Sequence, residues 1–91
     1  MNKQFEGKVA FISGGTSGLG KATVYELVKR GARVIFVGRD DAKAQEVINK
    51  CKELGGEAEY KNCDITKHQN VIDVFGYIRE RYGKLDFAGN V

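Results

Sequence analysis

The stretch VAFISGGTSGLG, residues 9–20, joins a short apolar run to a turn that holds four glycines. Residues 9–13 form a continuous apolar run that ends in serine, which is typical of a buried strand. From Leu19 to about Arg30 the apolar side chains share one helical face, and Gly31 follows as a helix stop. The pattern therefore predicts a strand that turns straight into a helix.

The rest of the chain continues this alternation of strands and helices. Residues 33–37 are β-branched and aromatic after an initial arginine, which favours a central parallel strand, and residues 41–54 carry apolar side chains at helical spacing. Residues 58–63 alternate between apolar and polar side chains, which indicates an edge strand with one solvated side. Gly83 ends a third helix, and residues 85–91 begin a fourth strand.

The third helix has a clear apolar stripe and a predicted cap. Thr66, with Gln69 three residues later, has the pattern of a capping box. The stripe consists of Val71, Val74, Phe75, Ile78 and Tyr82. The order βαβαβαβ, with crossovers long enough for right-handed connections, predicts an α/β fold with a doubly wound parallel sheet of Rossmann type.

Composition excludes several functional classes. The chain has 15 basic and 12 acidic residues, and their signs alternate, which is typical of a mixed solvated surface and not of a nucleic-acid-binding stripe. No apolar run approaches the ~18 residues that a membrane span needs, and residues 1–6 lack a secretory leader, so we expect a cytoplasmic protein. Cys51 and Cys63 lie on different predicted elements, which favours small buried hydrophobes over a metal site or a disulfide.

The glycine turn has a physical role if an anion binds beyond the first strand. A strand that leads directly into a helix aims the first helical amides and the positive end of the helix dipole at the carboxyl edge of the sheet, where a pyrophosphate fits. Gly14 allows the turn, Gly18 lets a phosphate approach the amides, and Gly20 lets the helix pack closely. The alternative is a glycine-rich turn without a ligand, but the strand-turn-helix context favours phosphate binding.

Four segments together resemble the short-chain dehydrogenase/reductase family. The loop SGGTSGLG, residues 13–20, is similar to the family's TGxxxGxG loop. Residues 62–66, NCDIT, resemble the segment after the third strand, and residues 83–86, GKLD, resemble the entry to the fourth. Residues 87–91, FAGNV, align with the approach to the NNAG motif.

The resemblance implies a strand order of 3-2-1-4 and a nicotinamide dinucleotide across the carboxyl ends of the strands. Asp64 would then meet the adenine ring, whereas a cap for the third helix, just ahead of Thr66, is the alternative. Asn90 and Val91 align with the first two positions of the NNAG motif. The implied cofactor-binding residues are Gly14, Thr16, Ser17, Gly18, Leu19, Gly20, Arg39, Asp64, Ile65 and Asn90.

Arg39, at the tip of the second strand, favours NADP(H) over NAD(H). In a dinucleotide-binding fold this tip lies near the adenosine ribose, where a carboxylate binds the hydroxyls of NAD. A guanidinium can instead grip a 2′-phosphate through paired, charge-assisted hydrogen bonds. Asp40 leaves alternatives open, because it could turn toward the ribose or pair with Arg39.

The family's catalytic Ser, Tyr and Lys follow the NNAG motif, so the resemblance places them after residue 91. Tyr25 and Lys29 spell YxxxK, but their helix starts at the phosphate loop, and we assign neither a catalytic role. We expect residues 1–91 to be the N-terminal half of one Rossmann domain, inactive alone, from a homo-oligomeric oxidoreductase that interconverts a carbonyl and an alcohol. The alternatives are a non-catalytic nucleotide-binding or redox-sensing module and a structural fragment that binds nothing.

Overall fold

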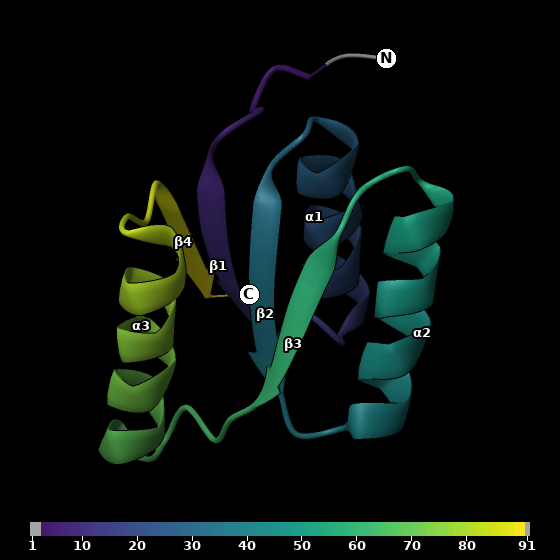
Figure 1. The fold of residues 1–91 in the computed structure, drawn as a ribbon. Coiled ribbons are helices and arrows are strands. Elements are labelled where there is room, and N and C mark those ends of the chain that lie inside the picture. The colour runs from purple at the N-terminus through teal and green to yellow at the C-terminus, as the bar shows by residue number, and fades with distance from the viewer. Residues whose placement is uncertain (1–2, 91) are drawn as a thin grey trace.

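The computed structural model describes residues 3–90, which form parallel strands that alternate with helices (Figure 1). The elements are β1 (Val9–Ser13), α1 (Gly18–Lys29), β2 (Arg33–Gly38), α2 (Asp41–Glu53), β3 (Ala58–Asn62), α3 (His68–Tyr82) and β4 (Phe87–Asn90). The strands pair in the order β3-β2-β1-β4. This order confirms the predicted doubly wound parallel sheet of Rossmann type.

The carboxyl ends of the strands lie together at one edge of the sheet. Ser13 at the end of β1 is opposite Val37 of β2 and Asn90 of β4. Gly38 at the end of β2 is opposite Asn62 of β3. The loops that leave β1, β2 and β3 therefore start side by side, and they carry nearly all of the residues that the sequence assigns to a ligand.

Helices cover both faces of the sheet, with α1 and α2 on one face and α3 on the other (Figure 1). The core beneath α1 and α2 contains Ala10, Ile12, Val24, Val28, Ala32, Val34, Phe36, Ala44, Val47 and Cys51. The core beneath α3 contains Val9, Phe11, Ile35, Val37, Cys63, Val74 and Ile78. Residues of β2 enter both cores, as its uninterrupted apolar run predicts. Both cysteines are buried as predicted, and burial raises the pKa of the Cys51 thiol to about 11.

The start of α3 differs from the predicted capping box. Lys67 is the N-cap residue, and its side chain makes no capping hydrogen bond. The Thr66 hydroxyl donates to Asp64 Oδ1 at 2.6 Å, and the Gln69 side-chain amide donates to Asp73 Oδ1 at 2.8 Å. The capping-box prediction is wrong because each of its two side chains has a carboxylate within reach.

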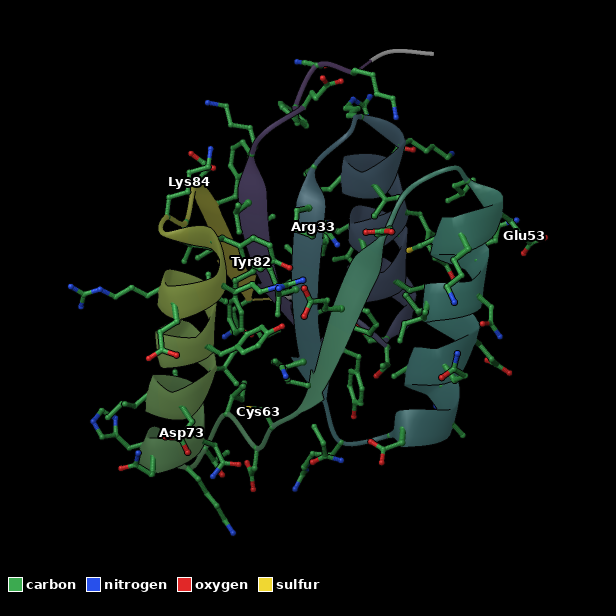
Figure 2. The ribbon with its side chains drawn as sticks, viewed as in Figure 1. Arg33, Glu53, Cys63, Asp73, Tyr82 and Lys84 are labelled. Atoms are coloured by element: carbon green, nitrogen blue, oxygen red, sulfur yellow. The ribbon has the colours of Figure 1, made fainter. Side chains whose placement is uncertain are left out.

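Strand β3 lies at an edge of the sheet, as predicted, but α3 covers its polar side. Glu59 accepts hydrogen bonds from the hydroxyls of Tyr77 and Tyr82, and the first of these raises the pKa of Tyr77. In Figure 2, Tyr82 reaches from α3 toward the sheet beside Arg33, whose guanidinium carbon lies 5.7 Å from the ring centroid. The polar residues that suggested a solvated side therefore help to hold α3 on the sheet.

Strand β4 begins later than predicted. Asp86 precedes it and bonds to the start of β1: its amide donates to the Val9 carbonyl, and its carboxylate accepts from the Val9 amide, each at 2.8 Å. The bond from Val9 holds the pKa of the Asp86 carboxyl below its usual range. Strand pairing starts at Phe87, and Val91 lies outside the described residues.

Candidate functional site

The loop between β1 and α1 is held in shape by its own hydrogen bonds. Gly14 has a φ of 75°, which confirms the left-handed turn expected there. Ser17 is the N-cap residue of α1, and its hydroxyl donates to the Gly14 carbonyl at 2.8 Å and accepts from the Gly20 amide at 3.3 Å. Gly18 and Leu19 lie in the first turn of α1, so their amides have no carbonyl partner within the helix. These two amides therefore face the space beyond the helix N-terminus. A preformed loop thus presents amides and a positive dipole end to the carboxyl edge.

Glycines in this loop have two different roles. A Cβ on Gly20 would lie 1.9 Å from the Gly14 carbonyl oxygen, and a Cβ on Gly15 would lie 2.7 Å from the Cβ of Phe36. In contrast, no atom lies within 4 Å of the position that a Cβ on Gly18 would take. Two glycines therefore pack the loop closely and the third opens space before the helix, which fits a pyrophosphate. The packing role of Gly15 was missed, although the double glycine is a signal for it.

Other predicted residues lie around this loop. Thr16 lies beside the tip of β2, because a Cβ on Gly38 would be 3.4 Å from its Oγ1. Leu19 in the first turn of α1 is 72% exposed, and Ile65 after β3 is 45% exposed. Both are large apolar side chains that a bound molecule at this edge could cover.

The acidic residues after β2 accept hydrogen bonds from groups other than Arg39. The Asp40 carboxylate accepts from the Lys43 amide at 3.0 Å and caps α2, so the suggested pairing of Asp40 with Arg39 is wrong. The Asn62 amide donates to Asp41 Oδ1 at 2.9 Å, and the Tyr60 hydroxyl lies 2.8 Å from the same oxygen. These two bonds lower the pKa of the Asp41 carboxyl.

Arg39 instead pairs with Asp64 across the ends of β2 and β3. Arg39 Nη1 lies 3.6 Å from Asp64 Oδ2, and the two side chains are 74% and 22% exposed. The other carboxylate oxygen of Asp64 accepts from the amide of Thr66 at 3.0 Å and from its hydroxyl. The Thr66 bonds, more than the Arg39 charge, hold the pKa of Asp64 below its usual range. The alternative of Asp64 as the cap of α3 is wrong, because the N-cap residue is Lys67.

The end of β4 closes the site on its other side. The Ser13 hydroxyl donates to Asn90 Oδ1 at 2.7 Å, which fixes the side chain at the carboxyl end of the strand. A hollow of about 300 Å³ lies here, and its lining includes Phe11, Ser13, Ile65 and Asn90. The fold thus brings together two predicted site residues, from the ends of β3 and β4, at one largely apolar hollow.

Two other sequence features acquire no role at this site. Tyr25 packs against the core under α1 and α2, where burial raises its pKa, and Lys29 pairs with Glu26 at 3.4 Å. His68 is exposed in the first turn of α3.

Among residues 3–90, no group of three His, Cys, Asp or Glu side chains is placed to hold a metal ion. No helix in the described part of the chain is long and apolar enough to cross a membrane.

The strand order, the glycine turn after β1 and the open helix N-terminus are those of an α/β fold of the Rossmann class. The family model of the short chain dehydrogenases matches residues 8–90. The chain belongs to this family, which confirms the resemblance noted in its motifs.

Individual relatives show how much of the family's length is present. The chain is 38% identical over 87 residues to 3beta-hydroxysteroid dehydrogenase of Mediterraneibacter gnavus, covering 96% of this chain and 32% of that protein. It superimposes on a metagenomic short-chain oxidoreductase in complex with NADP, with TM-score 0.90 and 29% identity over 93% of this chain and 38% of that one. It also superimposes on NAD+-bound xylitol dehydrogenase, with TM-score 0.87 and 27% identity over 93% and 33% of the two chains. The chain spans about a third of the length of these proteins, and their likeness does not distinguish NADP from NAD.

Proposed function

We propose that residues 1–91 form the NADP(H)-binding N-terminal portion of a short-chain oxidoreductase that interconverts a carbonyl and an alcohol. The amides of Gly18 and Leu19 would hold the pyrophosphate, and Asp64, with Ile65 next to it, would meet the adenine. The bound nicotinamide supplies or accepts the hydride. In the parent enzyme, the catalytic Ser, Tyr and Lys and the substrate pocket would come from the residues that follow this portion. The cytoplasmic location and the homo-oligomeric state remain predictions.

The preference for NADP(H) depends on which charged groups are available at the tip of β2. Asp40 would have to give up its cap on α2 to bind a ribose, at a cost of about 1 kcal/mol. Asp41 is already bonded to Tyr60 and Asn62. Arg39 is 74% exposed, so it can turn toward a phosphate. The engagement of both neighbouring carboxylates is the observation that most supports a 2′-phosphate site.

Substitution of Arg39 tests this proposal directly. Arg39→Ala removes the charge-assisted bonds to a 2′-phosphate, so NADPH binding should weaken about 10- to 100-fold, while NADH binding should change less than about twofold. Fluorescence titration of each dinucleotide into the folded chain measures both constants. Arg79→Ala, which removes the same charge from an exposed site on α3, is the matched control and should leave both constants unchanged.

Two results would count against the proposal in different ways. Equal losses for NADPH and NADH on Arg39→Ala would contradict the 2′-phosphate assignment but keep a dinucleotide site. No fluorescence change with either dinucleotide, in a sample shown to be folded, would contradict dinucleotide binding by this chain.

A further inference from the structure

The ion pair between Arg39 and Asp64 lies where the proposed function places the 2′-phosphate. The ends of β2 and β3 are held together by the bond from the Cys63 amide to the Gly38 carbonyl at 2.9 Å. Arg39 and Asp64 follow these two residues directly, and their charged groups meet at 3.6 Å. Any anion that binds Arg39 from this edge therefore approaches a carboxylate as well.

The two partners of this pair are held with different firmness. Asp64 is anchored, because one carboxylate oxygen takes both Thr66 bonds and the other is left to face Arg39. Arg39 is the exposed partner, and the carboxylate next to it in sequence, Asp40, caps α2 instead of pairing with it. A bound phosphate could thus draw Arg39 away, while Asp64 would stay beside the site.

We infer that Asp64 limits the preference for NADP(H) by competing with the 2′-phosphate for Arg39. This inference rests on the proposed function. An NADP(H) phosphate must share the guanidinium with Asp64 and meets the repulsion of its carboxylate. An unphosphorylated ribose carries hydroxyl groups, which can donate hydrogen bonds to a carboxylate and are not repelled by it. Asp64 is therefore a specificity-determining residue that acts in the opposite direction to Arg39.

Asp64→Asn is the appropriate variant, because an asparagine oxygen can still accept both Thr66 bonds. We expect the ratio of NADH to NADPH dissociation constants to rise about three- to tenfold at low salt, the effect of one unit charge a few ångströms away in water. The gain should shrink toward none in about 1 M salt, where the Debye length is roughly 3 Å. Both dinucleotides carry the adenine, so losing a contact between Asp64 and the adenine would change both dissociation constants by the same factor. The ratio of the two constants is therefore unaffected by such a contact.

The control and the double variant separate the possible explanations. Glu53→Gln removes the same charge from the far end of α2, which is well separated from Cys63 in Figure 2, and should leave the ratio unchanged. In an Arg39→Ala background the gain from Asp64→Asn should be smaller, because only direct repulsion of the phosphate remains.

The outcomes distinguish this inference from the proposed function. An unchanged ratio in Asp64→Asn, or equal losses of affinity for both dinucleotides, overturns the inference while the unaltered chain still binds NADPH. A failure of the unaltered, folded chain to bind either dinucleotide overturns the proposed function, and the inference with it.

Discussion

A methyl group added at Gly20 should destabilise the fold itself. The new Cβ would lie 1.9 Å from the Gly14 carbonyl oxygen, where ordinary contact begins at 3.4 Å. The loop cannot retreat easily, because Gly15 behind it is packed against Phe36. Such overpacking costs about 1–3 kcal/mol, and the better helix propensity of alanine offsets up to about 1 kcal/mol. We expect Gly20→Ala to lower the free energy of unfolding by about 1–2 kcal/mol, and Tm by roughly 4–16 °C.

Gly18→Ala, two residues earlier, should weaken dinucleotide binding but leave the stability of the free chain nearly unchanged. Its Cβ meets no atom within 4 Å, so the stability of the free chain should stay within about 0.5 kcal/mol. The methyl group would however enter the space proposed for the pyrophosphate and hold it away from the helical amides. The loss of one charge-assisted hydrogen bond, about 1.5–3 kcal/mol, predicts roughly 10- to 150-fold weaker binding of both NADPH and NADH.

Two measurements on each variant test this reasoning. Thermal unfolding followed by circular dichroism gives Tm, and fluorescence titration gives the dissociation constants. If Gly20→Ala unfolds at the same temperature as the unaltered chain, the close contact with Gly14 does not constrain the loop. If Gly18→Ala binds dinucleotides as well as the unaltered chain does, the pyrophosphate does not lie against this helix N-terminus.

The remaining predictions concern stability away from the loop. Gly76→Ala, in the exposed middle of α3, meets no atom within 4 Å and should raise the free energy of unfolding in urea by about 0.5–1 kcal/mol; a decrease would contradict the open surface there. Burial, followed by its bond to Asp41, raises the pKa of Tyr60 from 10.0 to about 12. Because the folded pKa is the higher one, the stabilisation from this hydroxyl should be complete below about pH 10 and disappear as the pH rises to about 12. Tyr60→Phe should lose this part of the pH dependence, and an unchanged alkaline profile of unfolding would refute the assignment.

The fold was predictable because its signals are local. The apolar run of β2, the helical stripes and the glycines at 14, 31 and 83 mark elements and turns within a few residues of sequence, and all three glycines have a positive φ. The ends of elements were less predictable. The sequence pattern predicts Thr66 as part of a cap for α3. In the structure the Thr66 hydroxyl donates a hydrogen bond to Asp64 instead, and the helix starts without a side-chain cap. The competition between nearby polar groups decides such details.

The candidate site was only partly predictable, because some of its charges meet only in the folded chain. The glycine loop could be interpreted from the sequence alone, since the strand, turn and helix are contiguous. The partner of Arg39 could not be predicted in this way. Asp64 follows a different strand, and the sequence offered the adjacent Asp40 as the partner. Asp40 caps α2, and the sequence holds a signal for this, because aspartate is a preferred N-cap residue and Asp40 directly precedes the helix expected from residue 41.

The site therefore divides into a rigid part and an adjustable part. The loop is shaped by the fold, through the turn at Gly14 and the two bonds of Ser17, so a dinucleotide would bind there with little further ordering of the backbone. Arg39 is exposed and paired with Asp64, so it would have to reorient to bind the proposed 2′-phosphate. Substitutions in the loop should then change the affinity for both dinucleotides alike, whereas substitutions at the ends of β2 and β3 should change their ratio. If the proposed site is correct, the choice of cofactor would depend on Arg39 and Asp64, and it could change without disturbing the packing of the glycine loop.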